Sequence, residues 1–167
     1  GVIAKGRPSF DSRSGNYNVF SALLARVLRN NPDSVLSAVN DGNAALTLFI
    51  PNDGAFRKLL PGTASAIDRV GERAVFAMLS KLPSSQIESL LLNHVFGGVT
   101  YGFGEALIAQ EISAKSASGV DTLIVRGKNG LLGLKLPNGG NRGFRPNVVP
   151  VRANLNYGNL QVAHIVD

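Results

Sequence analysis

The segment Thr47–Phe56, which reads TLFIPNDGAF, decides how the rest of the chain divides. The apolar run Leu46–Ile50 is typical of a buried strand, and Pro51 ends it because proline has no N–H to donate to a neighbouring strand. Asn52 and Asp53 are both residues that cap helices, so either of them can begin a short helix directly after the strand. The segment therefore predicts a buried strand that leads into a capped helix.

The sequence before this segment is mostly helical in pattern. Residues 1–16 are rich in Gly, Ser, Arg and Asn, and we interpret them as an N-terminal arm. Apolar residues between 19 and 28 repeat at the spacing of one helical face, which predicts a helix there. Pro32 is suited to the first turn of a second, shorter helix. Three residues form its expected apolar face: Val35, Leu36 and Val39.

The sequence after the segment changes from helical to extended patterns. A helix is expected near residues 72–79. Another follows Pro83, where Ser85 and Glu88 match a capping box, and it carries His94 near its end. Five strands are then expected, at residues 99–101, 123–126, 131–136, 148–151 and 160–166, with a hairpin turn at 127–130. Helices, one strand, helices and then strands favour an α+β domain over a regularly alternating parallel sheet.

Composition excludes several kinds of chemistry. The chain has 167 residues, 44% of them hydrophobic, and no cysteine, so disulfide scaffolds, thiol catalysis and cysteine zinc sites are ruled out. Two histidines leave little room for a histidine metal site, and we expect no metal and no cofactor. Gly102 and Gly104 lack the third glycine of a dinucleotide fingerprint, and neither a Walker loop nor a G-x-S-x-G elbow occurs. We therefore expect a protein that is not an enzyme.

Positive charge is concentrated in one part of the chain. Residues 1–114 carry ten Lys/Arg and nine acids, whereas residues 115–152 carry seven Lys/Arg and one acid, Asp121. A clustered positive field attracts polyanions, so this segment is the candidate contact for an acidic partner. Nucleic acid is not the expected partner, because residues 138–145 contain one aromatic side chain where stacking platforms use several. The candidate partner-binding residues are Arg126, Lys128, Lys135, Arg142 and Arg145.

Three segments together resemble the fasciclin-like domain. The quoted segment 47–56 is similar to the family's first box, and LLNHV at 91–95 is similar to its Tyr-His box, with Asn93 where Tyr is usual. NLQVAHIVD at 159–167 is similar to the last box. The boxes occur in the family's order, and the likeness extends from about Tyr17 to the last residue. The helix pair and the insert at 61–84 look most like bacterial secreted members.

The resemblance implies a single domain at residues 17–167 with a characteristic architecture. This architecture is a β-wedge of two sheets with about five or six helices packed at one end. The first and last boxes would then share a buried interior, in which His164 meets a polar group. The family usually continues through a short apolar tail, so we expect that a C-terminal tail has been cut off. The residues expected to have structural roles are Pro51, Asn52, Asp53, Phe56, His94, His164 and Asp167.

The resemblance also implies a secreted or cell-surface location and a non-enzymatic role in adhesion. The implied partners are an acidic polysaccharide, a cell-surface anion or an extracellular protein. Asn154 and Leu155 stand where animal members have an Asp-Ile or Asp-Leu pair that contacts integrins. The carboxylate is missing here, so that route is not expected. No apolar run approaches the ~20 residues that span a bilayer.

The alternative function is that of a carrier for an apolar small molecule, since some algal members of the family bind carotenoids. A carotenoid or lipid would occupy an apolar groove. The candidate lining residues are Leu48, Ile50, Phe56, Tyr101, Phe103 and Leu107.

Overall fold

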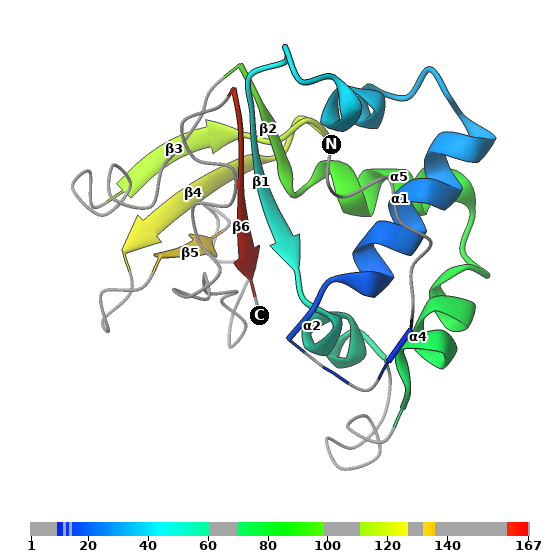
Figure 1. The fold of residues 1–167 in the computed structure, drawn as a ribbon. Coiled ribbons are helices and arrows are strands. Elements are labelled where there is room, and N and C mark those ends of the chain that lie inside the picture. Colours follow the sequence, from blue (N-terminus) through cyan, green and yellow to red (C-terminus); the bar gives the residue numbers. More distant parts are fainter. Residues whose placement is uncertain are drawn as a thin grey trace. The chain divides into compact units, whose positions relative to one another are not determined.

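Helices and sheets are both present in the computed structural model, which describes residues 10, 11, 13, 15–60, 70–98, 111–126, 132–135 and 160–166 (Figure 1). The chain forms two compact units, each built from two separate stretches. The first unit comprises residues 1–41 and 51–91 and holds the described helices. The second comprises residues 42–50 and 92–167 and holds the two described sheets. The mixed α+β class expected from the sequence is confirmed.

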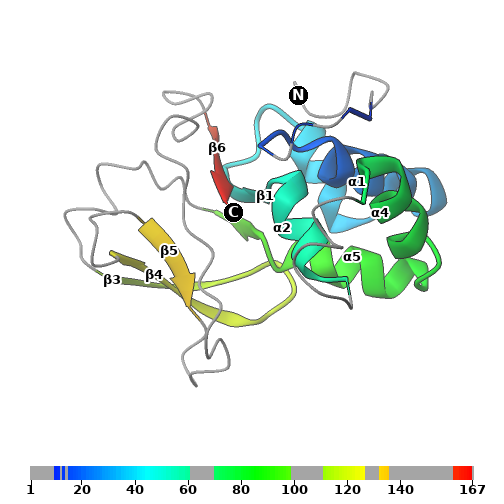
Figure 2. The same ribbon diagram turned by 90° about the horizontal axis from the view of Figure 1, so that it is seen from below.

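The first unit is organised around helix α1, Asn18–Asn30. Helices α2, Asp53–Lys58, and α4, Glu72–Leu79, both pack against α1 (Figure 2). The guanidinium group of Arg26 donates a hydrogen bond to the carbonyl oxygen of Ser80 over 3.1 Å, which ties α1 to the end of α4. The helical spacing predicted the buried face of α1 correctly: Val19, Phe20, Leu23, Leu24 and Val27 are all buried.

The second predicted helix is a 3-10 helix, η1, at Val35–Asn40. The hydroxyl of Ser34 caps it by accepting a hydrogen bond from the backbone N–H of Leu36 over 3.2 Å. Leu36 and Val39 are buried, but Val35 is 62% exposed, so its expected place on the apolar face is wrong. With three residues per turn, positions 36 and 39 lie above each other and position 35 points elsewhere.

Helix α5, Ser84–Leu92, starts and ends differently from the prediction. Ser85 lies inside the helix, in which the N–H groups of Gln86 and Ile87 donate to the carbonyl oxygen of Pro83. Glu88 does not complete a capping box, because its carboxylate accepts a hydrogen bond from the Ser34 hydroxyl instead. The helix also ends two residues before His94, which lies in the turn that follows. Both the capping box and the helical position of His94 are therefore wrong.

One sheet of the second unit has the strand order β2-β1-β6. Strand β1 is Leu46–Pro51, β2 is Val95–Gly97 and β6 is Gln161–Val166. β1 pairs with β2 in antiparallel register, and β6 runs beside β1 in the same direction (Figure 1). Every residue of β1 is buried, as the apolar run Leu46–Ile50 predicts. A central strand covered on both faces needs a continuous apolar run, which this segment has.

The other sheet is an antiparallel meander with the order β3-β4-β5. Its strands are β3, Glu111–Lys115, β4, Asp121–Arg126, and β5, Leu132–Lys135. The antiparallel pairing of β4 with β5 agrees with the hairpin predicted there, while β3 was not predicted. The predicted strands at residues 99–101 and 148–151 lie outside the described residues.

Candidate functional site

Asn52 and Asp53 have separate roles at the corner that follows β1. The side-chain oxygen of Asn52 accepts a hydrogen bond from the backbone N–H of Ala55 over 2.8 Å, so Asn52 caps α2. The carboxylate of Asp53 instead accepts from the backbone N–H groups of Asn18 and Val19, over 3.1 and 2.8 Å. These are the first two residues of α1, whose own N-cap residue provides no side-chain hydrogen bond. Asp53 thus caps a helix far from it in sequence.

Glu72 adds a second buried carboxyl group to this corner. It is the first residue of α4 and is 1% exposed. Its Oε2 accepts hydrogen bonds from the backbone N–H of Asp11, over 2.8 Å, and from the side-chain amide of Asn18, over 3.1 Å. Its Oε1 is buried and has no hydrogen-bond partner among the described residues. The corner therefore holds two neighbouring carboxyl groups, those of Asp53 and Glu72, both shielded from water.

Burial has a large effect on the ionisation of Asp53. Loss of hydration raises the pKa of its carboxyl from the ordinary 3.8 to about 7, and the charge and hydrogen bonding of Glu72 act in the same direction. The N–H groups of Val19 and Asn18 oppose this rise but do not cancel it. This pair is not predictable from the sequence, because a Glu at the start of a helix is ordinary and nothing in its spacing indicates Asp53 as a neighbour.

His164 occupies the interior of the first sheet. It is fully buried on β6, and its ring stacks on that of Phe49 with centroids 5.2 Å apart and planes at 24°. Phe49 also meets Phe96 edge-on, at 5.6 Å, and its backbone N–H donates to the carbonyl oxygen of His94 over 2.9 Å. The expectation that the first and last boxes meet in a shared interior is confirmed, since β1 and β6 are neighbours there.

The residues proposed to line an apolar groove fall into two groups. Leu48 and Ile50 on β1 and Phe56 on α2 are buried, as ordinary core residues are. Their role in binding a ligand therefore stays a prediction. The other three, Tyr101, Phe103 and Leu107, lie outside the described residues.

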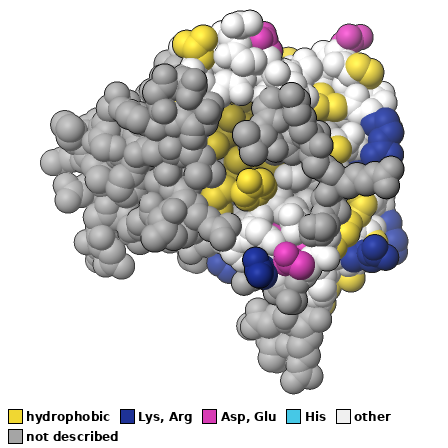
Figure 3. All heavy atoms as spheres, viewed as in Figure 1, with side chains coloured by type: hydrophobic (Ala, Val, Ile, Leu, Met, Phe, Trp, Pro, Cys, Tyr) yellow, Lys and Arg dark blue, Asp and Glu magenta, His cyan; other side chains and the backbone are white. Residues whose placement is uncertain are grey.

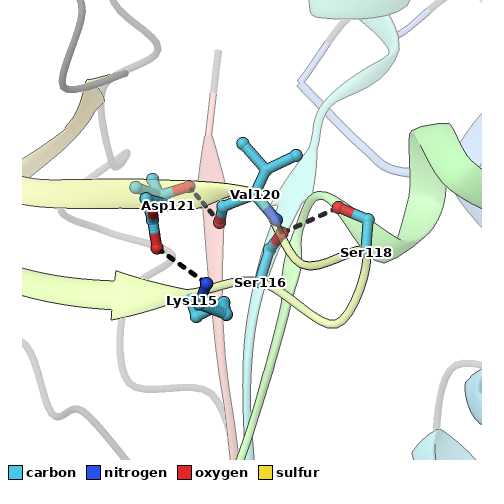
Figure 4. Close-up of polar contacts among 6 residues, drawn as sticks. Lys115, Ser116, Ser118, Val120 and Asp121 are labelled. Atoms are coloured by element: carbon cyan, nitrogen blue, oxygen red, sulfur yellow. Dashed lines mark hydrogen bonds and ion pairs between the residues drawn. The ribbon is translucent and has the colours of Figure 1, made fainter.

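The basic segment begins with a well-defined turn between β3 and β4. Lys115 and Asp121 form an ion pair across the strand ends, with 3.2 Å between Nζ and Oδ1 and with both side chains 66% exposed (Figure 4). The Ser116 hydroxyl accepts a hydrogen bond from the backbone N–H of Val120 over 3.2 Å and contacts the hydroxyl of Ser118 at 2.8 Å. Gly119 closes the turn with φ at +87°, a conformation that favours glycine.

The structure describes two of the five predicted partner-binding residues. Arg126 ends β4 opposite Leu132, and Lys135 ends β5 opposite Leu123. Lys128, Arg142 and Arg145 lie outside the described residues, as does Asp167. In the view of Figure 3, the visible Lys and Arg side chains lie mainly over the helical unit. Among the described residues, no group of three or more His, Asp or Glu side chains could hold a metal ion.

None of the helices in the described parts of the chain is long and apolar enough to cross a membrane.

Comparison with solved structures shows the type of fold. The chain is similar to a FAS1 domain pair from the insect cell adhesion molecule Fasciclin I, with a TM-score of 0.52 and 15% sequence identity. The match covers 86% of this chain and 42% of that chain, so this chain spans less than half of the length of its structural neighbour. No protein-family model matches the sequence, and no curated protein matches it. The fold is fasciclin-like, and at this identity the likeness extends to the fold alone.

Proposed function

We propose that this chain is a non-enzymatic, extracellular adhesion module that contacts acidic partners through its basic segment, residues 115–152. The partners would be acidic polysaccharides, cell-surface anions or acidic faces of extracellular proteins. The proposal includes a wedge-like arrangement of the two sheets with the helices at one end, and secretion of the protein. It is supported by the fold, which resembles that of a cell adhesion molecule.

The single observation that carries the choice of partner is the ion pair at the start of the basic segment. Asp121 is the only acid among residues 115–152, and it already pairs with Lys115. Six further cations follow before residue 153, and no acid occurs between residues 122 and 166. A positive charge density without local counter-charges attracts polyanions, and salt screens this attraction beyond about 8–10 Å.

The proposal predicts salt-sensitive binding to an anionic polysaccharide such as heparin. Reversing two cations of the segment, with Lys128→Glu and Arg142→Glu together, should weaken binding at least about tenfold at low salt. The expected size follows because a cation near an anionic surface contributes on the order of 1 kcal/mol. Affinity would be measured by calorimetry at several salt concentrations, with a neutral polysaccharide alongside.

The matched control makes the same change in net charge, but on the helical unit. Arg29 and Lys81 are both exposed there, so Arg29→Glu with Lys81→Glu produces the same total charge. Equal loss of affinity in the two double variants would show that only net charge matters and would contradict the proposal, as would binding that is indifferent to salt. Carotenoid or lipid recovered from the purified protein would favour the carrier function instead.

A further inference from the structure

We propose that the outer face of helix α4 docks on an anionic lipid surface, with Met78 and Leu82 entering the boundary between headgroups and acyl chains. The α4 face comprises the six exposed residues of the stretch 72–82, which are Arg73, Ala74, Ala77, Met78, Lys81 and Leu82. The inference rests on the helical unit alone. It does not depend on the proposed contact of residues 115–152 with acidic partners.

The α4 face is one continuous surface along the helix and the turn that follows it. Its members form two rows with a spacing of four residues, which is the spacing of neighbours on a helix surface. The backbone N–H of Lys81 donates to the carbonyl oxygen of Met78 over 3.2 Å. The N–H of Leu82 donates to the carbonyl oxygen of Leu79, where α4 ends, over 3.0 Å. The chain therefore continues α4 with a tighter turn, which carries Lys81 and Leu82.

The composition of the α4 face differs from that of an ordinary helix surface. All of its side chains are either apolar or positively charged. Met78 is 43% exposed and Leu82 is 40% exposed, one turn apart. In the same unit, by contrast, the exposed residues of α5 are all polar: Ser85, Gln86 and Ser89. Single exposed hydrophobic residues are normal on a protein surface, but neighbouring ones flanked by charges indicate an interaction site.

The acids close to the start of α4 face other groups. Glu72 is 1% exposed, and its Oε2 accepts a hydrogen bond from the backbone N–H of Asp11 over 2.8 Å. The carboxylate of Asp11 accepts hydrogen bonds within the N-terminal arm, from the backbone N–H of Arg13 and from the side-chain amide of Asn16. These two carboxylates therefore lie in the interior of the unit and against the arm, and the α4 face carries only positive charges.

Further cations lie beside the end of α4. The guanidinium group of Arg26 on α1 donates to the carbonyl oxygen of Ser80 over 3.1 Å. Arg29 lies three residues further along α1 and is exposed. In Figure 3, hydrophobic side chains and Lys or Arg side chains lie next to one another over the helical unit. This part of the surface thus combines apolar contact area with positive charge.

This combination fits an anionic bilayer surface better than the folded surface of an acidic protein. A helix face is convex, so its apolar side chains need a medium that adapts to their shape, as the boundary between headgroups and acyl chains does. Arg73 and Lys81 can lay their alkyl chains along the apolar region and keep their charged ends among the headgroups. Anionic lipids attract such cations, and salt weakens the attraction.

Vesicle binding by the full chain tests the proposal without a change in charge. Met78→Ser with Leu82→Ser should weaken binding to phosphatidylcholine vesicles that contain phosphatidylserine by at least about tenfold, because apolar contact area is lost. The heparin affinity of this variant should equal that of the wild type, since residues 115–152 are unchanged. The matched control is Val120→Ser with Leu160→Ser, which alters two exposed hydrophobic residues of the second unit and should leave vesicle binding unchanged.

A fluorescent probe tests whether the α4 face enters the lipid. The chain contains no tryptophan, so Met78→Trp introduces a single one. Its emission should shift to shorter wavelength on addition of phosphatidylserine vesicles, and brominated acyl chains should quench it. Val120→Trp should show neither change. Circular dichroism of each variant checks that the fold is retained.

Three results would overturn the proposal. The first is equal vesicle binding by the wild type and by Met78→Ser with Leu82→Ser. The second is a failure of the wild type to bind phosphatidylserine vesicles at low salt, or equal binding to vesicles of phosphatidylcholine alone. The third is a loss of polyglutamate binding in the double variant with vesicle binding unchanged, which would assign the α4 face to an acidic protein. Absence of heparin binding would contradict only the proposed role of residues 115–152.

Discussion

Asp53 and Asp121 are the same kind of side chain in opposite environments. Asp53 lies in the helical unit, fully buried, with a carboxyl neighbour and two backbone N–H donors. Asp121 lies in the strand unit, largely exposed, and faces the ammonium group of Lys115. Burial favours the neutral form of a carboxyl, whereas water and a nearby cation favour the charged form. The two sites show that environment, and not residue type, decides what an acidic side chain does here.

The comparison is sharpest when each aspartate is truncated. Asp53→Ala should destabilise the protein by about 1–3 kcal/mol at pH 5, because two N–H groups at the start of α1 lose a buried acceptor. The loss should be smaller at pH 8, where the substitution also removes repulsion with Glu72. Urea unfolding at the two pH values measures both numbers.

Asp121→Ala serves as the reference in the same experiment. It should change the free energy of unfolding by less than about 0.5 kcal/mol at either pH. A loss in Asp53→Ala that is larger at pH 8 than at pH 5 would refute the assigned ionisation of the buried site.

Asn52 sharpens the comparison with a neutral side chain. Asn52→Ala should cost about 1 kcal/mol, since the N–H of Ala55 loses its cap, while Asn52→Ser should restore most of the stability. Asn93 contacts the Ser118 hydroxyl in the exposed turn of the strand unit, and Asn93→Ala should stay within about 0.5 kcal/mol of wild type. Thermal unfolding of the three variants tests this order, and equal losses at Asn52 and Asn93 would contradict it.

The exposed ion pair gives the smallest expected effect. A double-mutant cycle with Lys115→Ala and Asp121→Ala should give a coupling energy of about 0.2–0.5 kcal/mol, in the lower part of the range for exposed pairs. Salt at 1 M should reduce it, because both side chains are exposed and screened. A larger coupling energy that persists at 1 M salt would show that this ion pair is not screened by solvent. That result would contradict the contrast between the exposed and the buried aspartate.

Several elements were predictable because their signals are local. The helical spacing of Val19–Leu28 is enough to give α1 and its buried face, and the run before Pro51 gives β1. The fasciclin-like resemblance added that β1 and β6 meet, which local pattern alone does not indicate. The structure bears out that pairing, with His164 stacked on Phe49.

The elements that were missed have signals that depend on distant partners. β2 is three residues long and begins only three residues after the end of α5, so its apolar residues also fit a continued helix. β3 alternates weakly, and its pairing with β4 is what defines it. Short strands are stabilised by their neighbours more than by their own propensity, so single-sequence patterns do not locate them.

The sequence by itself determined the α+β class, the helix and strand around Pro51, and the concentration of cations after residue 114. Those properties follow from local spacing and from counting charges. Only the tertiary structure decided that Asp53 caps α1, which starts 35 residues before it, and that Glu72 joins it in a buried pair. Proximity between residues distant in the chain arises from packing, and the ionisation of a carboxyl depends on the groups that packing brings around it.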